Sequence, residues 1–257
     1  MLACELRGRR DRTRLPLVLP LSDGLQARRF PFVNWALIAA NFAVWILYEL
    51  PNLNHAVFHA SFYPCAVNNS CHAPEPWGVA WITSMFLHGS WSHILGNMLF
   101  LAVFGKNVED AYGHVQYLVF YFAGGLVATL TQTAVTLWFG SAEAARIPNL
   151  GASGAIAATL GAFFILYPNS TVFGLIVIWP AWLPAWVFLG FWFLYQLFEG
   201  GFGLYSASAN GGGTAFFAHV GGFVYGGLVT FALMHRGRMS PRGQNDLPQP
   251  AVYGMRS

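Results

Sequence analysis

Two side chains that could exchange a proton, Ser153 and His219, stand in stretches that are otherwise almost purely apolar. Ser153 lies in a Gly-Ala-Ser-Gly run, and His219 lies in a Phe-Phe-Ala-His-Val-Gly-Gly run. Polar groups inside a membrane are costly, and the default interpretation is that they face the interior of a helix bundle and carry function. A histidine within hydrogen-bond reach of a serine can activate it as a nucleophile. The pair therefore predicts nucleophilic catalysis if the fold brings the two residues together.

A third polar cluster contains His93 and Asn97, which are four residues apart and so share one helical face. Acyl transfer needs hydrogen-bond donors aimed at the oxyanion of the tetrahedral intermediate. An imidazole N–H, a side-chain amide and the backbone N–H of Ser153 could serve. The alternative is that both side chains only bond loops or neighbouring helices. A zinc site is disfavoured because no acid accompanies the histidines at ligand spacing and no His-Glu-x-x-His occurs. No metal and no cofactor are expected.

The composition indicates a membrane protein. Hydrophobic residues make up 56% of the 257 residues and charged residues only 9%, whereas an ordinary soluble domain has about 25% charged residues. A large soluble core would still need a charged shell, and this chain has too few charges to build one. We expect one membrane domain in contact with lipid, and the net charge of +3 requires no nucleic-acid partner.

The elements that must position these residues are apolar stretches of roughly 20 residues, the length that spans a bilayer. Six stretches predict an all-α fold, a polytopic bundle of six transmembrane helices. The short apolar run that follows the fourth stretch could be an early start of the fifth helix, delayed or kinked by Pro180 and Pro184. The expected spans are residues 32–50, 80–104, 115–139, 151–168, 182–198 and 214–234.

The distribution of basic residues predicts that both termini are cytoplasmic. With six spans, twelve of the thirteen basic residues fall on one side and only Arg146 lies opposite, as the positive-inside rule requires. The predicted organisation is a basic N-terminal segment (1–30), the membrane domain (31–235) and a disordered cytoplasmic tail (236–257). A mitochondrial presequence is an alternative interpretation of the arginine-rich start, but Glu5 and Asp11 interrupt it.

The topology places the loop of residues 51–79 outside, together with Cys65 and Cys71. In an oxidising compartment these two cysteines could form a small loop-closing disulfide, and two free thiols are the alternative. Cys4 falls on the cytoplasmic side, where it is expected to be reduced.

Small residues predict that spans 4 and 6 approach each other closely. Span 6 has Ala218, Gly222 and Gly226 at four-residue intervals, and span 4 is rich in alanine and glycine from Gly151 onward. Such residues let two helix backbones come into contact. Both spans run inward from the outside, so Ser153 and His219 are expected at similar depth near the external face. A tight bundle without catalysis is the alternative explanation of the glycines.

Taken in order, these motifs resemble the rhomboid family of intramembrane serine proteases, over roughly residues 30–235. Each motif alone is weak, and their order, span assignment and common depth make the combination specific. The motifs are His-Ile-Leu-Gly-Asn at 93–97, Gly-Ala-Ser-Gly at 151–154, Ala-His-Val-Gly-Gly at 218–222 and a Gly-x-x-x-Glu turn at 105–109.

The resemblance implies a role for each matching residue. It makes Ser153 the nucleophile and His219 the general base of a dyad without a third acid, and no Asp or Glu occurs in spans 4 or 6. It further implies that Gly151 shapes the backbone of the oxyanion pocket. His93 and Asn97 would be the side-chain donors of this pocket. His88 would support the junction between loop and helix, and Glu109 would be a structural anchor.

The chain departs from some family members in two places. A tyrosine that packs on the catalytic imidazole is replaced by Ala157, so other neighbours must orient His219, with Phe216 or Phe217 as candidates. The Trp-Arg pair of the first external loop is also missing, although Trp77 and Trp81 remain.

The resemblance implies an intramembrane serine endopeptidase that cleaves single-pass transmembrane proteins near the external face of the plasma or inner membrane. It also suggests lateral substrate entry between spans 2 and 5. One alternative is a catalytically inactive rhomboid-like protein that binds transmembrane helices, but such relatives typically lack the serine or the histidine. Another is a small transporter, which would predict acidic partners in the spans or an internal repeat, and neither was identified.

Overall fold

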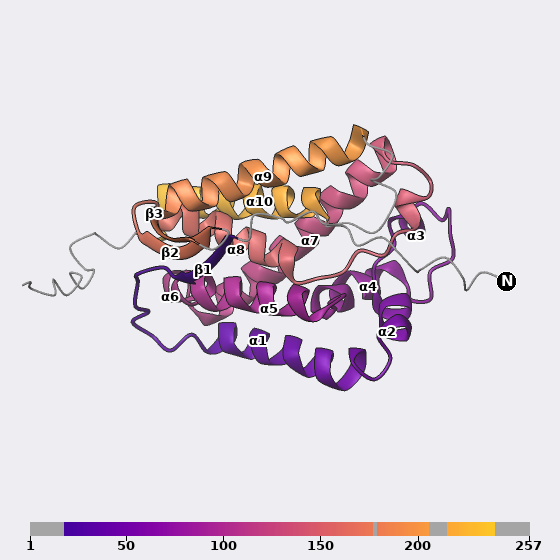
Figure 1. The fold of residues 1–257 in the computed structure, drawn as a ribbon, viewed down its shortest axis with the longest axis horizontal. Helices are drawn as coiled ribbons and strands as arrows, with labels where there is room; N and C mark the ends of the chain where they lie inside the picture. The colour runs from indigo at the N-terminus through magenta and orange to yellow at the C-terminus, as the bar shows by residue number, and fades with distance from the viewer. Residues whose placement is uncertain (1–17, 177–178, 206–214, 240–257) are drawn as a thin grey trace, which may run out of the picture.

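The computed structural model describes residues 18–176, 179–205 and 215–239. They form an elongated bundle of roughly aligned helices with a small β-sheet at one end (Figure 1). Residues 1–17, with Cys4 and the first arginines, and the tail from residue 240 lie outside the described part of the chain. The expected domain boundaries at 30 and 235 stay predictions.

Within the described residues, three helical segments are long and apolar enough to cross a membrane. The first joins α1 (Phe32–Val44) to a π-helical turn, η1 (Trp45–Glu49). The others are α7 (His114–Phe139) and α10 (Phe216–His235). They correspond to expected spans 1, 3 and 6, while the count of six remains a prediction.

The fourth and fifth expected spans also contain helices, α8 (Ser153–Leu166) and α9 (Ala185–Tyr205). With only 14 residues, α8 is about 21 Å long at 1.5 Å per residue. Nearly all of its side chains are buried, so α8 is the central helix around which the others pack.

The second expected span, residues 80–104, is not one helix, and this prediction was wrong in detail. The chain forms α4 (Trp77–Thr83) and a 3-10 turn, η2 (Ser84–Phe86), and then leaves the helical path. A new helix, α5, begins at Trp91 because Ser90 caps it, with its Oγ accepting from the His93 N–H at 3.2 Å. The helical path then continues through α5 (Trp91–Phe100), the π-helical η3 (Leu101–Gly105) and α6 (Lys106–Tyr112).

The fold is mostly helical but not all-α, which corrects the sequence-based expectation. Three antiparallel strands form one sheet in the order β1-β2-β3, with β1 spanning Val18–Ser22, β2 Thr171–Ile176 and β3 Trp179–Pro184. The apolar run before the fifth helix is therefore a hairpin rather than an early helix start. The two prolines lie on β3, an edge strand, where a missing N–H is tolerated.

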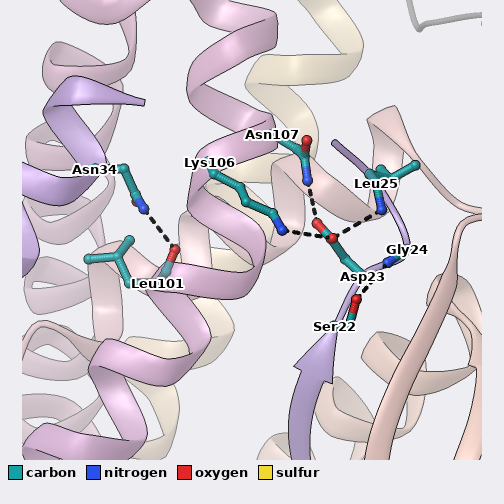
Figure 2. A network of polar contacts seen from close by, with 8 residues as sticks. All are labelled: Ser22, Asp23, Gly24, Leu25, Asn34, Leu101, Lys106 and Asn107. Atoms are coloured by element: carbon teal, nitrogen blue, oxygen red, sulfur yellow. Dashed lines mark hydrogen bonds and ion pairs between the residues drawn. The ribbon is translucent and has the colours of Figure 1, made fainter. Parts of the chain in front are cut away.

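A buried carboxylate ties the end of β1 to α6 (Figure 2). Asp23 is fully buried and lies 3.2 Å from the ammonium group of Lys106, and its carboxylate also accepts from the Asn107 side chain and from the Leu25 N–H. Desolvation by burial raises the pKa of Asp23 above its ordinary 3.8, and Lys106 offsets part of this. The N-terminal strand is thereby anchored to the helical bundle as well as to the sheet.

A second buried carboxylate, Glu109, accepts the N–H groups of Val33 and Asn34 at 2.9 and 2.7 Å. These belong to the first turn of α1, where N–H groups have no acceptor within the helix. Glu109 thus acts as the structural anchor that was expected of it, and it holds the start of α1 against α6.

The outer loop contains α2 (Leu53–Ala60), α3 (Pro64–Val67) and a disulfide between Cys65 and Cys71. The disulfide resolves the alternative that the sequence left open. Phe62 pairs with Asn149 through two backbone hydrogen bonds of 3.0 and 2.7 Å. This bridge attaches the outer loop to the segment that leads into α8.

Candidate active site

Ser153 is the first residue of α8. The first N–H groups of a helix lack acceptors within it, so the Ser153 N–H is placed where it could bind a ligand oxygen. The turn before the helix is made by Gly151, whose φ of +122° is a conformation that favours glycine. The sequence around Ser153 therefore builds a helix start that no side chain caps.

His93, Gly151 and Ser153 meet at one point. A Cβ atom at Gly151 would lie 3.0 Å from both Cε1 and Nε2 of His93, and 3.5 Å from Oγ of Ser153. Glycine is favoured here by its φ, and any side chain would also crowd the His93 ring. The N–H of Gly151 donates to the Ser84 carbonyl at 2.9 Å, so this amide holds the turn in place. The proximity of His93 and Ser153 is the first element of the predicted oxyanion pocket.

Asn97 lies one turn after His93 on α5. Its side chain is only 9% exposed, and among the described residues its Nδ2 atom has no hydrogen-bond partner. A buried amide donor without a partner is costly unless a ligand uses it. This is the condition expected of an oxyanion donor before substrate binds.

The helices that carry Ser153 and His219 are in direct contact. A Cβ atom at Gly222 would overlap the Gly154 carbonyl oxygen, and one at Gly226 would overlap that of Ala158. The predicted close approach of spans 4 and 6 is confirmed. Glycine is needed at both positions because backbone, rather than a side chain, occupies the space.

The imidazole of His219 is buried and held from α9. Its Nδ1 atom lies 2.8 Å from Oε1 of Gln196, while Nε2 has no partner within the described part of the chain. The structure contains no hydrogen bond between Ser153 and His219. Catalytic hydrogen bonds are often long or absent before substrate binds. The Nε2 atom is therefore available as a base.

The neighbours of His219 differ from those expected. The indole of Trp192, one turn before Gln196, lies 5.8 Å from the imidazole in a tilted arrangement. Phe216 instead contacts Tyr195, and Phe217 packs beside Gly200. Side chains of α9 thus occupy the role that was assigned to the two phenylalanines.

A buried acid also supports the site, and the sequence reasoning missed it. Glu49 is fully buried at the end of η1, and its Oε1 accepts from the backbone N–H of His88 at 2.6 Å. The His88 ring lies 5.0 Å from that of His93, whose Nδ1 accepts from the Gly89 N–H at 3.3 Å. Glu49 belongs to the first expected span, whereas expected spans 4 and 6 contain no Asp or Glu.

A π-helical turn provides this support. Trp45, at the start of η1, packs edge-on against Trp91 with ring centroids 5.3 Å apart. The turn therefore contacts the beginning of α5 with Trp45 and the preceding loop with Glu49. Single π-helical turns occur often at functional sites.

A small cavity adjoins Ser153. Its volume of about 30 Å³ exceeds the roughly 10–15 Å³ that one water molecule needs. Polar groups of Gln132, Thr129 and Asn149 line it, together with Ser84 and Gly151. A polar cavity of this size can hold a water molecule beside Ser153.

Both missed residues, Gln196 and Glu49, carried a detectable signal. Gln196 is the one side-chain amide of expected span 182–198, and Glu49 is the one charged residue of expected span 32–50, so each interrupts an apolar stretch as Ser153 and His219 do. What the sequence could not reveal is the partner of each, because that depends on how the helices pack.

Comparison with known proteins agrees with this geometry. A family model described as the rhomboid domain matches residues 75–236, which include all five expected site residues. The chain is 32% identical over 108 residues to "Rhomboid protein 1, mitochondrial" of Saccharomyces cerevisiae, covering 41% of this chain and 30% of the yeast protein. It is 26% identical over 149 residues to "Putative rhomboid protease YdcA" of Bacillus subtilis, covering 56% of this chain and 68% of that protein.

The matched stretch thus spans less than a third of the yeast protein and about two thirds of the Bacillus one. The domain match covers more than half of this chain, and it coincides with the part that holds the Ser153 turn, the α8–α10 contact and His219. Together with its apolar helices, this makes the chain an integral membrane protein, and it belongs to the rhomboid family.

Proposed function

We propose that the chain is an intramembrane serine endopeptidase in which Ser153 is the nucleophile and His219 the general base. The observation that carries the proposal is the packing of α8 on α10. It brings the helix start at Ser153 and a buried imidazole with an unpartnered Nε2 onto contacting helices. A serine and a base within reach of each other form the arrangement that activates a hydroxyl for acyl transfer.

In the first step, Oγ of Ser153 attacks the carbonyl carbon of the scissile peptide while Nε2 of His219 takes the hydroxyl proton. The oxyanion is stabilised by the Ser153 N–H and by donors from His93 and Asn97. The C–N bond then breaks, and His219 returns the proton to the leaving amine. The product is an ester between Ser153 and the N-terminal part of the substrate.

Water must reach this ester to complete the reaction. His219 takes a proton from the attacking water, the ester C–O bond breaks, and the proton returns to Oγ of Ser153. The cavity lined by Gln132 and Asn149 supports this step, because it offers space for water beside Ser153. Polar groups at membrane depth are tolerated where they line such a space.

The proposed substrates are single-pass transmembrane proteins with small or helix-breaking residues near the external membrane face. A scissile carbonyl within a helix is hydrogen-bonded, so the substrate must unwind locally. In the proposed topology six spans cross the cell membrane with both termini in the cytoplasm, because twelve basic residues then lie on one side. The substrate reaches the site from the lipid, beside α9.

The test uses the purified full-length chain in liposomes with a model single-span substrate. We expect cleavage by the wild type and none by Ser153→Ala or His219→Ala, with a fluorophosphonate labelling Ser153 in the wild type. Equal cleavage by all three proteins would exclude Ser153 and His219 as the catalytic dyad. Binding of the substrate without cleavage by the wild type would favour an inactive helix-binding member of the family.

A further inference from the structure

We propose that Gln196 is a positioning residue for His219, so that the catalytic unit draws on three helices, α8, α9 and α10. The inference deepens the proposed function and rests on it. Its basis is the side-chain contact of 2.8 Å between Oε1 of Gln196 and Nδ1 of His219. A rhomboid dyad needs no third residue for proton transfer, but its base must still present the correct nitrogen to the serine.

The contact determines which ring nitrogen carries the proton. An amide oxygen only accepts hydrogen bonds, so the contact between Nδ1 and Oε1 is a hydrogen bond only when Nδ1 carries the proton. In a neutral imidazole Nε2 is then the acceptor, and Nε2 of His219 is the atom left without a partner. Gln196 thus selects the tautomer in which His219 can take the proton of Ser153.

Burial makes this contact effective. Gln196 is 5% exposed and His219 is 7% exposed, so water does not compete strongly for either group. A polar side chain buried in an apolar helix is costly without a partner, and this contact provides one for both. The indole of Trp192 lies beside the same ring, one turn earlier on α9. Two side chains of α9 thus contact the imidazole: Gln196 at its Nδ1 atom and Trp192 beside the ring.

The start of α10 is held by a separate glutamine. Oε1 of Gln132, on α7, accepts the backbone N–H of Ala218 at 3.2 Å. Gln132 therefore holds the backbone of α10, whereas Gln196 holds the ring of His219. The two roles are separable, because loss of Gln196 leaves the backbone bond in place.

The placement of Gln196 on α9 links the position of this helix to catalysis. Any displacement of α9 away from α10 removes the acceptor of the Nδ1 proton and releases the ring. If substrate enters beside α9, the base is correctly oriented only when α9 packs against α10 again.

The experiment compares Gln196→Glu, Gln196→Met and Gln196→Asn in liposomes, with Leu228→Ala, at an exposed position on α10, as control. We expect Gln196→Met to lower kcat about 100-fold with little change in KM, the loss that misplacing a catalytic group causes. Gln196→Asn is one methylene too short and should lose activity similarly. Leu228→Ala should cleave like the wild type.

Gln196→Glu distinguishes positioning from packing. A carboxylate accepts but does not donate, so it keeps the Nδ1 bond, and we expect activity within about tenfold of the wild type. It also stabilises the imidazolium, so the acidic limb of the kcat/KM profile should move to higher pH. The other titratable groups near the ring, His93 on α5 and Glu199 one turn after Gln196, are unchanged in this variant.

Three outcomes would overturn the role of Gln196. The first is wild-type kcat and pH profile in Gln196→Met, and the second is equal loss in Gln196→Glu and Gln196→Met. If Gln196→Met does not fold, full activity of Gln196→Asn is the third. Failure of the protease proposal itself is distinct, because cleavage would then be unaffected by Ser153→Ala.

Discussion

The Nδ1 atom of His219 on α10 lies 2.8 Å from Oε1 of Gln196 on α9, while Nε2 of the same ring has no partner among the described residues. One side of the imidazole is therefore fixed by protein and the other is open for the serine. The helix that fixes the ring, α9, is neither α8, which begins with Ser153, nor α10, which carries His219 itself. Substitutions at single residues can therefore test the role of each part of the site.

Removing a proposed oxyanion donor should impair chemistry more than folding. Asn97→Ala deletes a buried donor that has no partner in the described structure, so stability should change little. We expect kcat to fall about 100- to 1,000-fold, the loss seen when one oxyanion donor is removed. Steady-state cleavage in liposomes and thermal unfolding provide the two measurements. Leu95→Ala, at a half-exposed position on α5, is the matched control, and an unchanged kcat in Asn97→Ala would exclude Asn97 as a donor.

Removing the carboxylate of Glu49 should loosen the loop before α5. In Glu49→Ala the buried N–H of His88 loses its acceptor, which costs about 1–3 kcal/mol of unfolding free energy. Activity should fall as well, because the His88 turn positions His93. Glu49→Gln keeps an acceptor oxygen and should retain most of the stability. Unfolding midpoints in detergent compare the three proteins, and identical midpoints would show that the bond contributes nothing.

Adjacent glycines on α10 offer a test of the helix contact. A Cβ at Gly226 would overlap the carbonyl oxygen of Ala158, whereas a Cβ at Gly227 would make ordinary contacts at 3.8 Å. We expect Gly226→Ala to destabilise the protein by about 1–3 kcal/mol through overpacking and to reduce cleavage by separating Ser153 from His219. Gly227→Ala should be neutral or slightly stabilising, because alanine favours helix. Equal unfolding midpoints in the two variants would contradict the close contact.

Asp23 should make stability depend on pH in a direction set by its burial. Because burial raises the pKa of Asp23 above 3.8, its contribution to stability is full below that value. The contribution is lost as the pH rises through the raised pKa of the folded state. The stability of the wild type relative to Asp23→Asn should therefore decrease as the pH rises above 3.8. Unfolding midpoints of both proteins across this range test the prediction, and a constant difference would oppose it.

Much of the site could be predicted because polar residues stand out in apolar helices. Ser153 and His93 are brought together around Gly151, as the motifs implied, and the glycines of α10 let it contact α8. The contacts of Gln196 and Glu49 were not predicted, although both residues interrupt apolar spans. Their partners lie on other elements, and a single sequence gives no register between helices.

The fold was predicted less completely than the site. The sequence left open that the run after α8 begins the fifth helix, because a short apolar run fits either a helix or a strand. In the structure it forms a hairpin, and its two prolines lie on the edge strand β3, where a missing N–H is tolerated. The interruption of the helical path before α5 was not predicted, because the apolar residues on both sides of Gly89 and Ser90 make the whole stretch hydrophobic on average. There a cap and a turn, rather than apolar length, determine where the helix begins.

The pairing of β1 with β2 has a consequence for the order of assembly. The strand at Val18–Ser22 is synthesised before any helix of the bundle, but its hydrogen-bonding partner, Thr171–Ile176, follows α8. During synthesis β1 therefore has no β2 to pair with until most of the chain has left the ribosome. Contacts between distant parts of a chain form late because loop closure must precede them. β1 thus cannot reach its final place in the sheet until α8 and β2 have been made, although it precedes α1 in the chain.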